Sequence, residues 1–379
     1  MRDMTSALNA LIDTVRQAAD ERKPLRICGG GSKDFLGLRP QGEVLDTRGV
    51  SGIVSHEPSE LVVTVRGGTP LAELEAVLAD KGQCLAFEPP RLGAATVGGM
   101  VAAGLSGPAR ASAGAVRDFI LGLQLVNGRG ELLIFGGQVM KNVAGYDVSR
   151  LMAGAMGTLG VLAEVSLKVM PVAPAEATLC FDMTQSDALT ALNRWGGQPL
   201  PLNASCWVQD KGRSVLYVRL RGAVAAVQAA CRSMGGQRLD NATVAPDWEA
   251  CREQTLPFFT SPAANPAHPD APDHALWRVS VPQTAPALDL GGQPAAAQLV
   301  EWHGGQRWLW APADQGPAIR AAVQAAGGHA TLYRVAADAD RAQGFMSPLP
   351  PALMDIHRRL KAEFDPAGIF NPGRMYAEF

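Results

Sequence analysis

Three consecutive glycines directly after a short apolar strand constrain this chain more than any other feature. The strand is predicted at residues 25–28, and the loop after it reads Gly29, Gly30, Gly31, Ser32 and Lys33. Glycine allows positive φ and a close approach of ligand to backbone, so successive N–H groups can converge on an anion such as a pyrophosphate. An ordinary tight turn is the alternative, and the loop alone leaves both open. It matches neither GxxxxGK[ST] nor GxGxxG, so nucleotide binding here requires a fold other than a P-loop or a Rossmann fold.

Two further segments are rich in glycine and other small residues. Residues 89–107 are dense in Gly and Ala, which would leave a flat trough where a planar ring lies against the backbone. Close helix packing is the alternative, and we favour the trough. Residues 141–161 read KNVAGYDVSRLMAGAMGTLGV. All three segments lie in the first half of the chain, which places the candidate ligand site there.

Length and composition exclude several classes of protein. The 379 residues suit two domains of ordinary size, and 34 Lys and Arg against 36 Asp and Glu give no basic stripe for nucleic acid. Six dispersed cysteines without a CxxC predict no zinc or iron–sulfur cluster in this chain. No signal peptide is visible at the N-terminus, and glycines and a proline break the longest uncharged stretch, residues 92–109. We therefore expect a cytoplasmic protein without direct membrane insertion.

Turn residues and apolar periodicity predict the elements around these segments. Thr69 as N-cap and Pro70 as the first helical residue predict a helix start. Alternating apolar residues across 119–135 predict a β-hairpin around the turn at 127–130. From about Pro171, strands are followed by Ala-rich helices, which indicates a separate α+β domain.

The ordered set GGGSK, ATVGG, KNVAGYD and GTLG, within residues 26–171, resembles the signature of FAD-linked oxidases related to vanillyl-alcohol oxidase. The sequence FDPAGIFNPGRMY, residues 364–376, resembles the ending of the members that act on 2-hydroxy acids. In its length and in WHGGQRWL, residues 302–309, the chain is most similar to the FAD-binding E subunits of glycolate oxidase. Only the middle of the chain diverges from this group.

This resemblance implies an α+β fold. Residues 1–171 would form a PCMH-type FAD-binding domain of two α+β subdomains. Residues 172–345 would form a reduced antiparallel-sheet cap domain with a Pro-rich loop at 257–294. Residues 346–379 would supply a C-terminal helix and a return to the FAD-binding domain.

By resemblance, the residues that contact FAD are mostly small ones whose backbone faces the cofactor. They are Gly29, Gly30, Gly31, Ser32, Lys33, Pro89, Thr96, Gly98, Gly99, Ala103, Ser106, Gly107, Gly114, Val116, Gly157, Gly160, Val161 and Asn371. Relatives that tether FAD covalently carry a histidine or cysteine where this chain has Ser32 and residues 108–110, so we expect non-covalent FAD. Met156 stands where many relatives have an acidic residue, which removes a polar contact at the flavin edge.

No catalytic base is assigned, and no metal site is expected. Catalytic 2-hydroxy-acid dehydrogenases of this superfamily carry an HxGDGNxH segment, which this sequence lacks, and its six histidines show no ligand spacing. Tyr146, Arg150, His303 and Arg307 are candidates to lie near the flavin ring or to hold a carboxylate. Support of the fold is the favoured interpretation for Tyr146 and Arg150.

The resemblance implies the FAD-binding subunit of a glycolate oxidase (glycolate dehydrogenase) complex, which converts glycolate to glyoxylate. Its partners would be a larger FAD-containing catalytic D subunit and an iron–sulfur F subunit, and its own flavin would relay electrons or support assembly. Attachment to the inner membrane would be peripheral and through those partners. One alternative is a self-sufficient FAD-linked dehydrogenase of another 2-hydroxy acid such as D-lactate. Another is a structural subunit with a vestigial flavin site.

Overall fold

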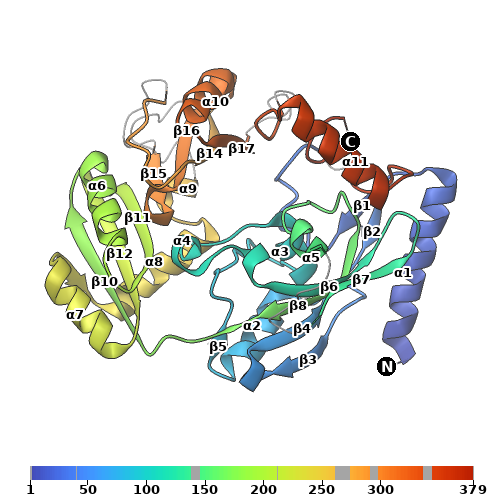
Figure 1. Cartoon of the computed structure of the whole chain (residues 1–379), viewed down its shortest axis with the longest axis horizontal. Coiled ribbons are helices and arrows are strands. Elements are labelled where there is room, and N and C mark those ends of the chain that lie inside the picture. The colour runs from blue at the N-terminus through green and yellow to red at the C-terminus, as the bar shows by residue number, and fades with distance from the viewer. Residues whose placement is uncertain are drawn as a thin grey trace. The chain divides into compact units, whose positions relative to one another are not determined.

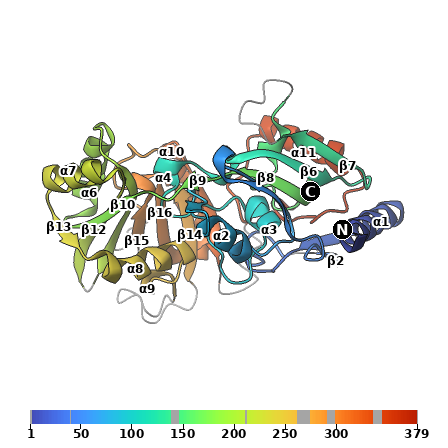
Figure 2. The same ribbon diagram turned by 90° about the horizontal axis from the view of Figure 1, so that it is seen from below.

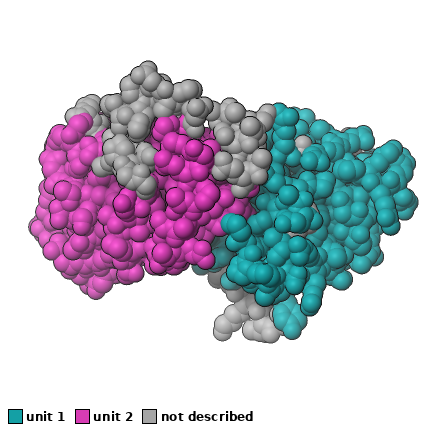
Figure 3. All heavy atoms as spheres, turned by 90° about the horizontal axis from the view of Figure 1, so that it is seen from above, with its two compact units in different colours: residues 1–106, 115–172, 348–379 teal, residues 107–114, 173–347 magenta. Residues whose placement is uncertain are grey.

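The chain divides into two compact units. The structure is a computed structural model that describes residues 2–39, 41–137, 146–210, 212–260, 274–290, 298–335 and 344–378. Unit 1 comprises Met1–Ser106, Ala115–Val172 and Pro348–Phe379, and unit 2 comprises Gly107–Gly114 and Ala173–Ser347 (Figure 3). The eight-residue segment Gly107–Gly114 thus leaves unit 1 and joins unit 2, whereas the sequence placed it with its neighbours in the FAD-binding domain.

Unit 1 is built on an antiparallel five-stranded sheet (Figure 1). In spatial order its strands are β3 (Ile53–Glu57), β4 (Val62–Arg66), β8 (Val161–Lys168), β6 (Ile120–Val126) and β7 (Leu132–Gly136). A parallel pair, β1 (Leu25–Cys28) and β2 (Glu43–Asp46), and an antiparallel pair, β5 (Gln83–Cys84) and β9 (Met170–Pro171), complete the unit. The β-branched residues of β4 and β8 are buried, as their composition favours.

Helices cover the strands of unit 1. They are α1 (Arg2–Glu21), α2 (Leu71–Ala79), α3 (Val97–Ala103), α5 (Val148–Leu151) and α11 (Pro351–Phe364), with 3₁₀ turns η1 (Pro58–Glu60) and η2 (Val116–Asp118). One core cluster joins α1, through Leu11 and Val15, to Leu25 of β1 and to Phe370 near the other end of the chain. The backbone of Leu25 also accepts from Asn371 N at 2.9 Å, so residues 369–371 lie alongside β1.

Unit 2 contains an antiparallel eight-stranded sheet. Its order is β13 (Gln237–Leu239), β10 (Ala175–Asp182), β12 (Arg213–Gly222), β11 (Leu202–Asp210), β15 (Gln298–Glu301), β16 (Gln306–Pro312), β14 (His274–Ser280) and β17 (His329–Arg334). The remaining elements are α4 (Arg110–Ala113), α6 (Gln185–Gly196), α7 (Val224–Met234), α8 (Asn241–Glu253), α9 (Pro257–Thr260), α10 (Gly316–Ala325), η5 (Trp302–Gly304) and η6 (Ala313–Gln315).

Helices lie on both faces of this sheet (Figure 2). Leu179 of β10 packs in one cluster with Leu192 of α6 and Val227 of α7. Its neighbour Thr178 points to the opposite face, where its Oγ1 accepts from Trp248 Nε1 of α8 at 2.9 Å. The alternation of side chains along the strand therefore decides which helix each residue meets.

The structure confirms the α+β class and the hairpin, in which β6 and β7 pair antiparallel around Asn127. The predicted helix cap is wrong. Helix α2 begins at Leu71 with Pro70 at the cap position, and Thr69 Oγ1 instead accepts from Gly52 N at 2.8 Å. Across the parts of the chain that the structure describes, no helix has the length and apolar character needed to cross a membrane.

A buried ion pair stabilises the packing of α11 against the core of unit 1. The Lys361 ammonium donates to Asp365 Oδ2 at 2.7 Å and to the carbonyl oxygens of Thr158 at 2.7 Å and Phe370 at 2.8 Å. The two charged side chains are only 7% and 0% exposed. Lys361 thus holds the loop before β8 and the segment beside β1 at the same point.

We expect Lys361→Ala to lower the free energy of unfolding by about 3–5 kcal/mol, because it leaves the Asp365 carboxylate buried without its partner. Arg358→Ala is the matched control, since Arg358 on the same helix pairs with Asp355 in solvent, at 51% and 61% exposure. That control should cost less than about 1 kcal/mol. Denaturant titration measures both, and equal losses would contradict a structural role for the buried pair.

Candidate functional site

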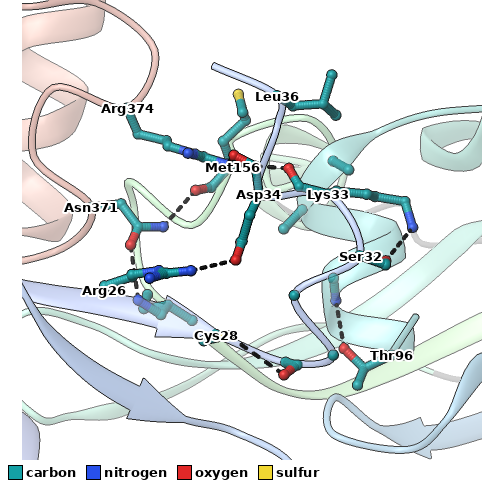
Figure 4. A pocket seen from close by; sticks show the side chains of 17 residues that line it. Arg26, Cys28, Ser32, Lys33, Asp34, Leu36, Thr96, Met156, Asn371 and Arg374 are labelled. Carbon is teal, nitrogen blue, oxygen red and sulfur yellow. Dashed lines mark hydrogen bonds and ion pairs between the residues drawn. The ribbon is translucent and has the colours of Figure 1, made fainter. Parts of the chain in front are cut away.

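A pocket in unit 1 collects residues from four distant parts of the chain (Figure 4). It encloses about 610 Å³, part of which is open to solvent. Its lining consists of Arg26, Ile27, Cys28, Gly29, Gly30, Gly31, Ser32, Lys33, Asp34, Leu36, Thr96, Gly99, Ala102, Ala103, Met156, Asn371 and Arg374. Strand β1 and its loop, helix α3, the loop before β8 and the segment after α11 therefore meet at one site.

The glycine loop lies against the segment that precedes α3. A Cβ on Gly30 would stand 1.4 Å from the carbonyl oxygen of Ala94, and one on Gly29 would stand 2.3 Å from Thr96 Oγ1. Gly31 has φ +68°, a conformation that residues with a side chain rarely adopt. Gly30 is thus required by the close approach of the Ala94 carbonyl, Gly29 by the Thr96 side chain and Gly31 by its backbone conformation. All three line the pocket, where they present backbone and no side chain.

Small residues of α3 form the opposite wall. Thr96 is the N-cap, and its Oγ1 accepts from Gly99 N at 3.2 Å. Gly99, Ala102 and Ala103 share one face of the helix because residues three and four apart lie together. A planar ring can approach this face closely, since none of these side chains extends beyond a methyl group.

Asn371 ties three parts of the pocket together. Its Oδ1 accepts from Ile27 N at 2.8 Å, and its Nδ2 donates to the carbonyl oxygen of Met156 at 2.7 Å (Figure 4). The backbone of Met156 is itself held by Ala102, whose carbonyl oxygen accepts from Met156 N at 2.8 Å. Both ends of the Asn371 amide are therefore used to position the backbone around the pocket.

Cations outnumber carboxylates around the pocket. Arg26 forms an ion pair with Asp34, and Lys33 Nζ donates to the carbonyl oxygen of Arg91 at 3.0 Å. Arg374 donates to the carbonyl oxygens of Lys33 and Asp34, each at 3.2 Å. The buried Nε of Arg26 has no hydrogen-bond partner among the described residues. This orphaned donor and the surplus of positive charge fit a bound pyrophosphate.

Part of the predicted contact set lines the pocket. The predicted residues found there are Gly29, Gly30, Gly31, Ser32, Lys33, Thr96, Gly99, Ala103 and Asn371. The pocket is also lined by residues outside the predicted contact set: Arg26, Ile27, Cys28, Asp34, Leu36, Ala102, Met156 and Arg374. Alternation along β1 and helical spacing from Gly99 would have indicated some of them, whereas nothing in the local sequence marks Arg374.

The other predicted contacts occupy different places, and their roles toward FAD stay predictions. Gly98 packs on Gly67, whose carbonyl oxygen accepts from Gly98 N at 2.7 Å. A Cβ on Gly160 would lie 2.7 Å from the carbonyl oxygen of Val126, and one on Gly157 would lie 2.6 Å from Asn371 Nδ2. The remaining ones are Pro89, Ser106, Val116 and Val161 in unit 1 and Gly107 and Gly114 in unit 2.

Three of the four candidate reactive residues are placed for structural roles or lie in solvent. Tyr146 is 96% exposed, and Arg150 forms an ion pair with Asp147 at 2.8 Å. Arg307 is buried, and its Nη1 and Nη2 donate to the carbonyl oxygens of Pro286 at 2.5 Å and Ala285 at 2.6 Å. Residues 141–145 of the KNVAGYD segment and parts of the Pro-rich loop, 261–273 and 291–297, lie outside the described residues.

His303 is held between two serines of unit 2. Its Nε2 lies 3.0 Å from Ser112 Oγ and its Nδ1 lies 3.1 Å from Ser205 Oγ, which also accepts from His303 N at 2.9 Å. Burial lowers the pKa of His303 from 6.5 to about 4. The imidazole is therefore neutral at pH 7. In the described part of the chain, no group of three or more His, Cys, Asp or Glu side chains is placed to hold a metal ion.

We expect the His303 ring to stay neutral until the pH approaches its pKa of about 4. Because the unfolded chain binds this proton near pH 6.5, the stability contributed by neutral His303 is complete above that pH. It is then lost progressively as the pH falls toward 4, by up to roughly 3 kcal/mol. Imidazole NMR titration, with His303→Gln to assign the signal, measures the pKa, and a value near 6.5 would contradict the burial seen here.

Comparison with solved structures supports the fold assignment. An alkyldihydroxyacetonephosphate synthase superposes with a TM-score of 0.67 at 17% identity, covering 96% of this chain and 74% of that one. The sequence pattern of the FAD binding domain family matches residues 6–136. The chain therefore binds FAD. The matched range includes β1, the glycine loop and α3, which line the pocket in unit 1.

We expect Gly30→Ala to abolish stoichiometric FAD binding, because a Cβ at 1.4 Å from the carbonyl oxygen of Ala94 must displace the loop. FAD content is read from the visible absorbance of the purified chain, and FAD affinity is measured by titration of the apoprotein. Gly196→Ala is the control, since no atom lies within 4 Å of a Cβ at that position. Wild-type FAD content in Gly30→Ala would show that the close approach of the glycine loop to Ala94 is not required for FAD binding.

One relative covers nearly the whole chain, and a second covers part of it. Glycolate oxidase subunit GlcE of Escherichia coli is 44% identical over 370 residues, which cover 97% of each chain. Glycolate oxidase subunit GlcD of Bacillus subtilis is 29% identical over 163 residues, 42% of this chain and 35% of that protein. The first match extends through both units, including the part that diverges from the wider group. The chain belongs to the GlcE family of glycolate oxidase subunits, which are FAD-linked oxidoreductase proteins.

Proposed function

We propose that this chain is the FAD-binding subunit of a glycolate oxidase complex, which oxidises glycolate to glyoxylate and passes electrons to partner subunits. The observation that carries the proposal is a pocket with a glycine cradle and surplus positive charge, in a chain 44% identical to GlcE of Escherichia coli along 97% of its length. A self-sufficient dehydrogenase of another 2-hydroxy acid remains the alternative that the test below separates.

The FAD is proposed to bind without a covalent bond. The N–H groups of residues 29–33 and the orphaned Nε of Arg26 would hold the pyrophosphate, and the small face of α3 would receive the ring. Cys28 is the cysteine that lines the pocket, and burial raises the pKa of its thiol, so it stays protonated and a poor nucleophile. No histidine is among the described residues of the lining.

When bound, FAD supplies a two-electron acceptor for substrate oxidation. Glycolate becomes glyoxylate when its C–H bond gives a hydride and its hydroxyl gives a proton. The residues of this chain contribute binding and orientation: Asn371 fixes the backbone around the pocket, and Arg374 holds the loop that carries Lys33.

The division of labour within the chain and the complex is part of the proposal. We assign FAD binding to residues 1–171 with the C-terminal return 346–379, and the cap to residues 172–345. The membership in a family of subunits supports a multi-subunit complex. We propose a larger FAD-containing D subunit and an iron–sulfur F subunit as its partners, and a cytoplasmic location with peripheral attachment to the inner membrane through them.

The visible spectrum of the purified chain tests this proposal. We expect flavin absorbance bands that glycolate, added anaerobically, bleaches only after the partner subunits are present. Denaturation and filtration should release the FAD, because no covalent bond is expected. D-lactate serves as the comparison substrate.

Other outcomes separate the alternatives. Rapid bleaching of the isolated chain by D-lactate, with turnover to a dye acceptor, would favour the self-sufficient dehydrogenase. A colourless chain that takes up no FAD would mean that the flavin site is vestigial and that the proposal is wrong.

A further inference from the structure

The segment that follows α11 reaches the pocket of unit 1 with little regular structure. The residues described after α11 form no helix or strand apart from one bridge between Leu25 and Phe370. A segment near a chain end is usually poorly ordered unless specific contacts tie it down. We call residues 369–376 the C-terminal strap, because they supply Asn371 and Arg374 to the lining of the pocket (Figure 4).

Two buried side chains of the strap hold the two ends of the glycine loop. Before the loop, Asn371 Oδ1 accepts from Ile27 N at 2.8 Å. After the loop begins to turn away, the Arg374 guanidinium donates to the carbonyl oxygens of Lys33 at 3.2 Å and Leu38 at 2.8 Å. Asn371 and Arg374 are each 6% exposed. The strap therefore fixes the loop from both ends through buried hydrogen bonds.

The backbone of the strap also fits closely against the residues that follow the glycine loop. Leu38 N donates to the carbonyl oxygen of Arg374 at 3.0 Å. A Cβ on Gly37, which has φ +76°, would stand 2.5 Å from the same oxygen. Because these atoms are closely packed, a displacement of the strap requires a displacement of the loop.

The hydrogen bond between Asn371 and Met156 joins two residues with strained backbone. Asn371 Nδ2 donates to the carbonyl oxygen of Met156 at 2.7 Å, and the two residues have φ 42° and 51°. Left-handed backbone is unfavourable for residues with a side chain, and it persists only where the surrounding structure holds it. Buried hydrogen bonds therefore favour the docked strap and this strain opposes it, so a ligand that binds better to the docked form can shift the equilibrium.

We propose that docking of the C-terminal strap and binding of FAD are coupled, so that each favours the other. The glycine loop is the shared element, because its backbone lines the pocket and the strap holds both of its ends. Such coupling is reciprocal: a strap that improves FAD affinity must itself be held more tightly when FAD is bound. Arg374 is then a positioning residue that acts on the cofactor through the loop. The inference rests on the proposed function in that it takes FAD as the ligand of this pocket.

Hydrogen–deuterium exchange of the full chain, with and without saturating FAD, tests the coupling. We expect the backbone amides of residues 371–376 to exchange about tenfold more slowly with FAD, which is a typical size for coupling between two sites. Helix α8 of unit 2 is the internal control, and its amides should exchange equally in both samples. Equal exchange of the strap with and without FAD would overturn the inference.

Arg374→Lys tests the coupling from the side of the strap. Lysine keeps the positive charge but lacks the planar fork that reaches several carbonyl oxygens at once, so FAD affinity of the apoprotein should fall about tenfold. Arg358→Lys is the matched control on α11, since Arg358 is 51% exposed, and it should leave FAD affinity unchanged. Unchanged FAD affinity in Arg374→Lys would overturn the inference, because the charge alone would then be sufficient. If Arg374→Lys does not fold, exchange in the unaltered chain carries the test.

Glycolate turnover and strap exchange keep the two proposals apart. Turnover is measured on the assembled complex, whereas exchange is measured on the isolated chain. Slower strap exchange with FAD, in a chain whose assembled complex does not oxidise glycolate, would contradict the proposed function alone. Normal turnover by the complex, with strap exchange that FAD does not change, would contradict the coupling alone.

Discussion

The close approach of the glycine loop to the segment before α3 is the constraint on which the site in unit 1 depends. Two backbone segments meet where a single extra carbon on Gly30 would overlap the carbonyl oxygen of Ala94. Because Gly29, Gly30 and Gly31 carry no side chains, this part of the loop can offer backbone N–H groups to the pocket that it lines. Such donors cost no side-chain entropy when a ligand arrives, since the strand and the helix have already fixed them.

Residues of α11 and of the segment after it then connect the other parts of unit 1 around the pocket. Asn371 connects β1 to the loop before β8, and Lys361 binds the carbonyl oxygens of Thr158 and Phe370. Both are buried polar groups held by hydrogen bonds, so they stabilise only an arrangement in which these particular segments meet. The pocket is therefore shaped by contacts between residues that are remote in sequence.

Several helices and strands could be predicted from residues that are close together in the sequence. The strand before the glycine loop, the hairpin around Asn127 and the helix at Pro351–Phe364 follow from periodicity and turn chemistry. The prediction of Thr69 as the N-cap was wrong because its hydroxyl oxygen accepts a hydrogen bond from Gly52 N instead. Capping rules consider only the residues next to the helix start in the sequence, so they do not include a competing hydrogen bond to a distant residue.

The contact set was harder to predict because glycine serves two purposes in this fold. Gly29 and Gly30 line the pocket, whereas Gly98 and Gly160 do not line it and serve packing, with Gly98 against Gly67 and Gly160 against Val126. The sequence shows only that a side chain is absent and not which neighbour requires it. The charged lining residues Arg26 and Arg374 were not predicted for a different reason, since a lone arginine carries no periodic signal.

The bond from Ile27 to Asn371 joins residues 344 positions apart, and this has a consequence for the timing of assembly. Ribosomes add roughly 5–20 residues per second, so about 17 to 69 s separate the synthesis of the two partners. During that interval the glycine loop and α3 are present without the Asn371 side chain, which later bonds Ile27 and Met156. All of unit 2 is synthesised within the same interval, so the cofactor pocket is completed only after the second unit has emerged.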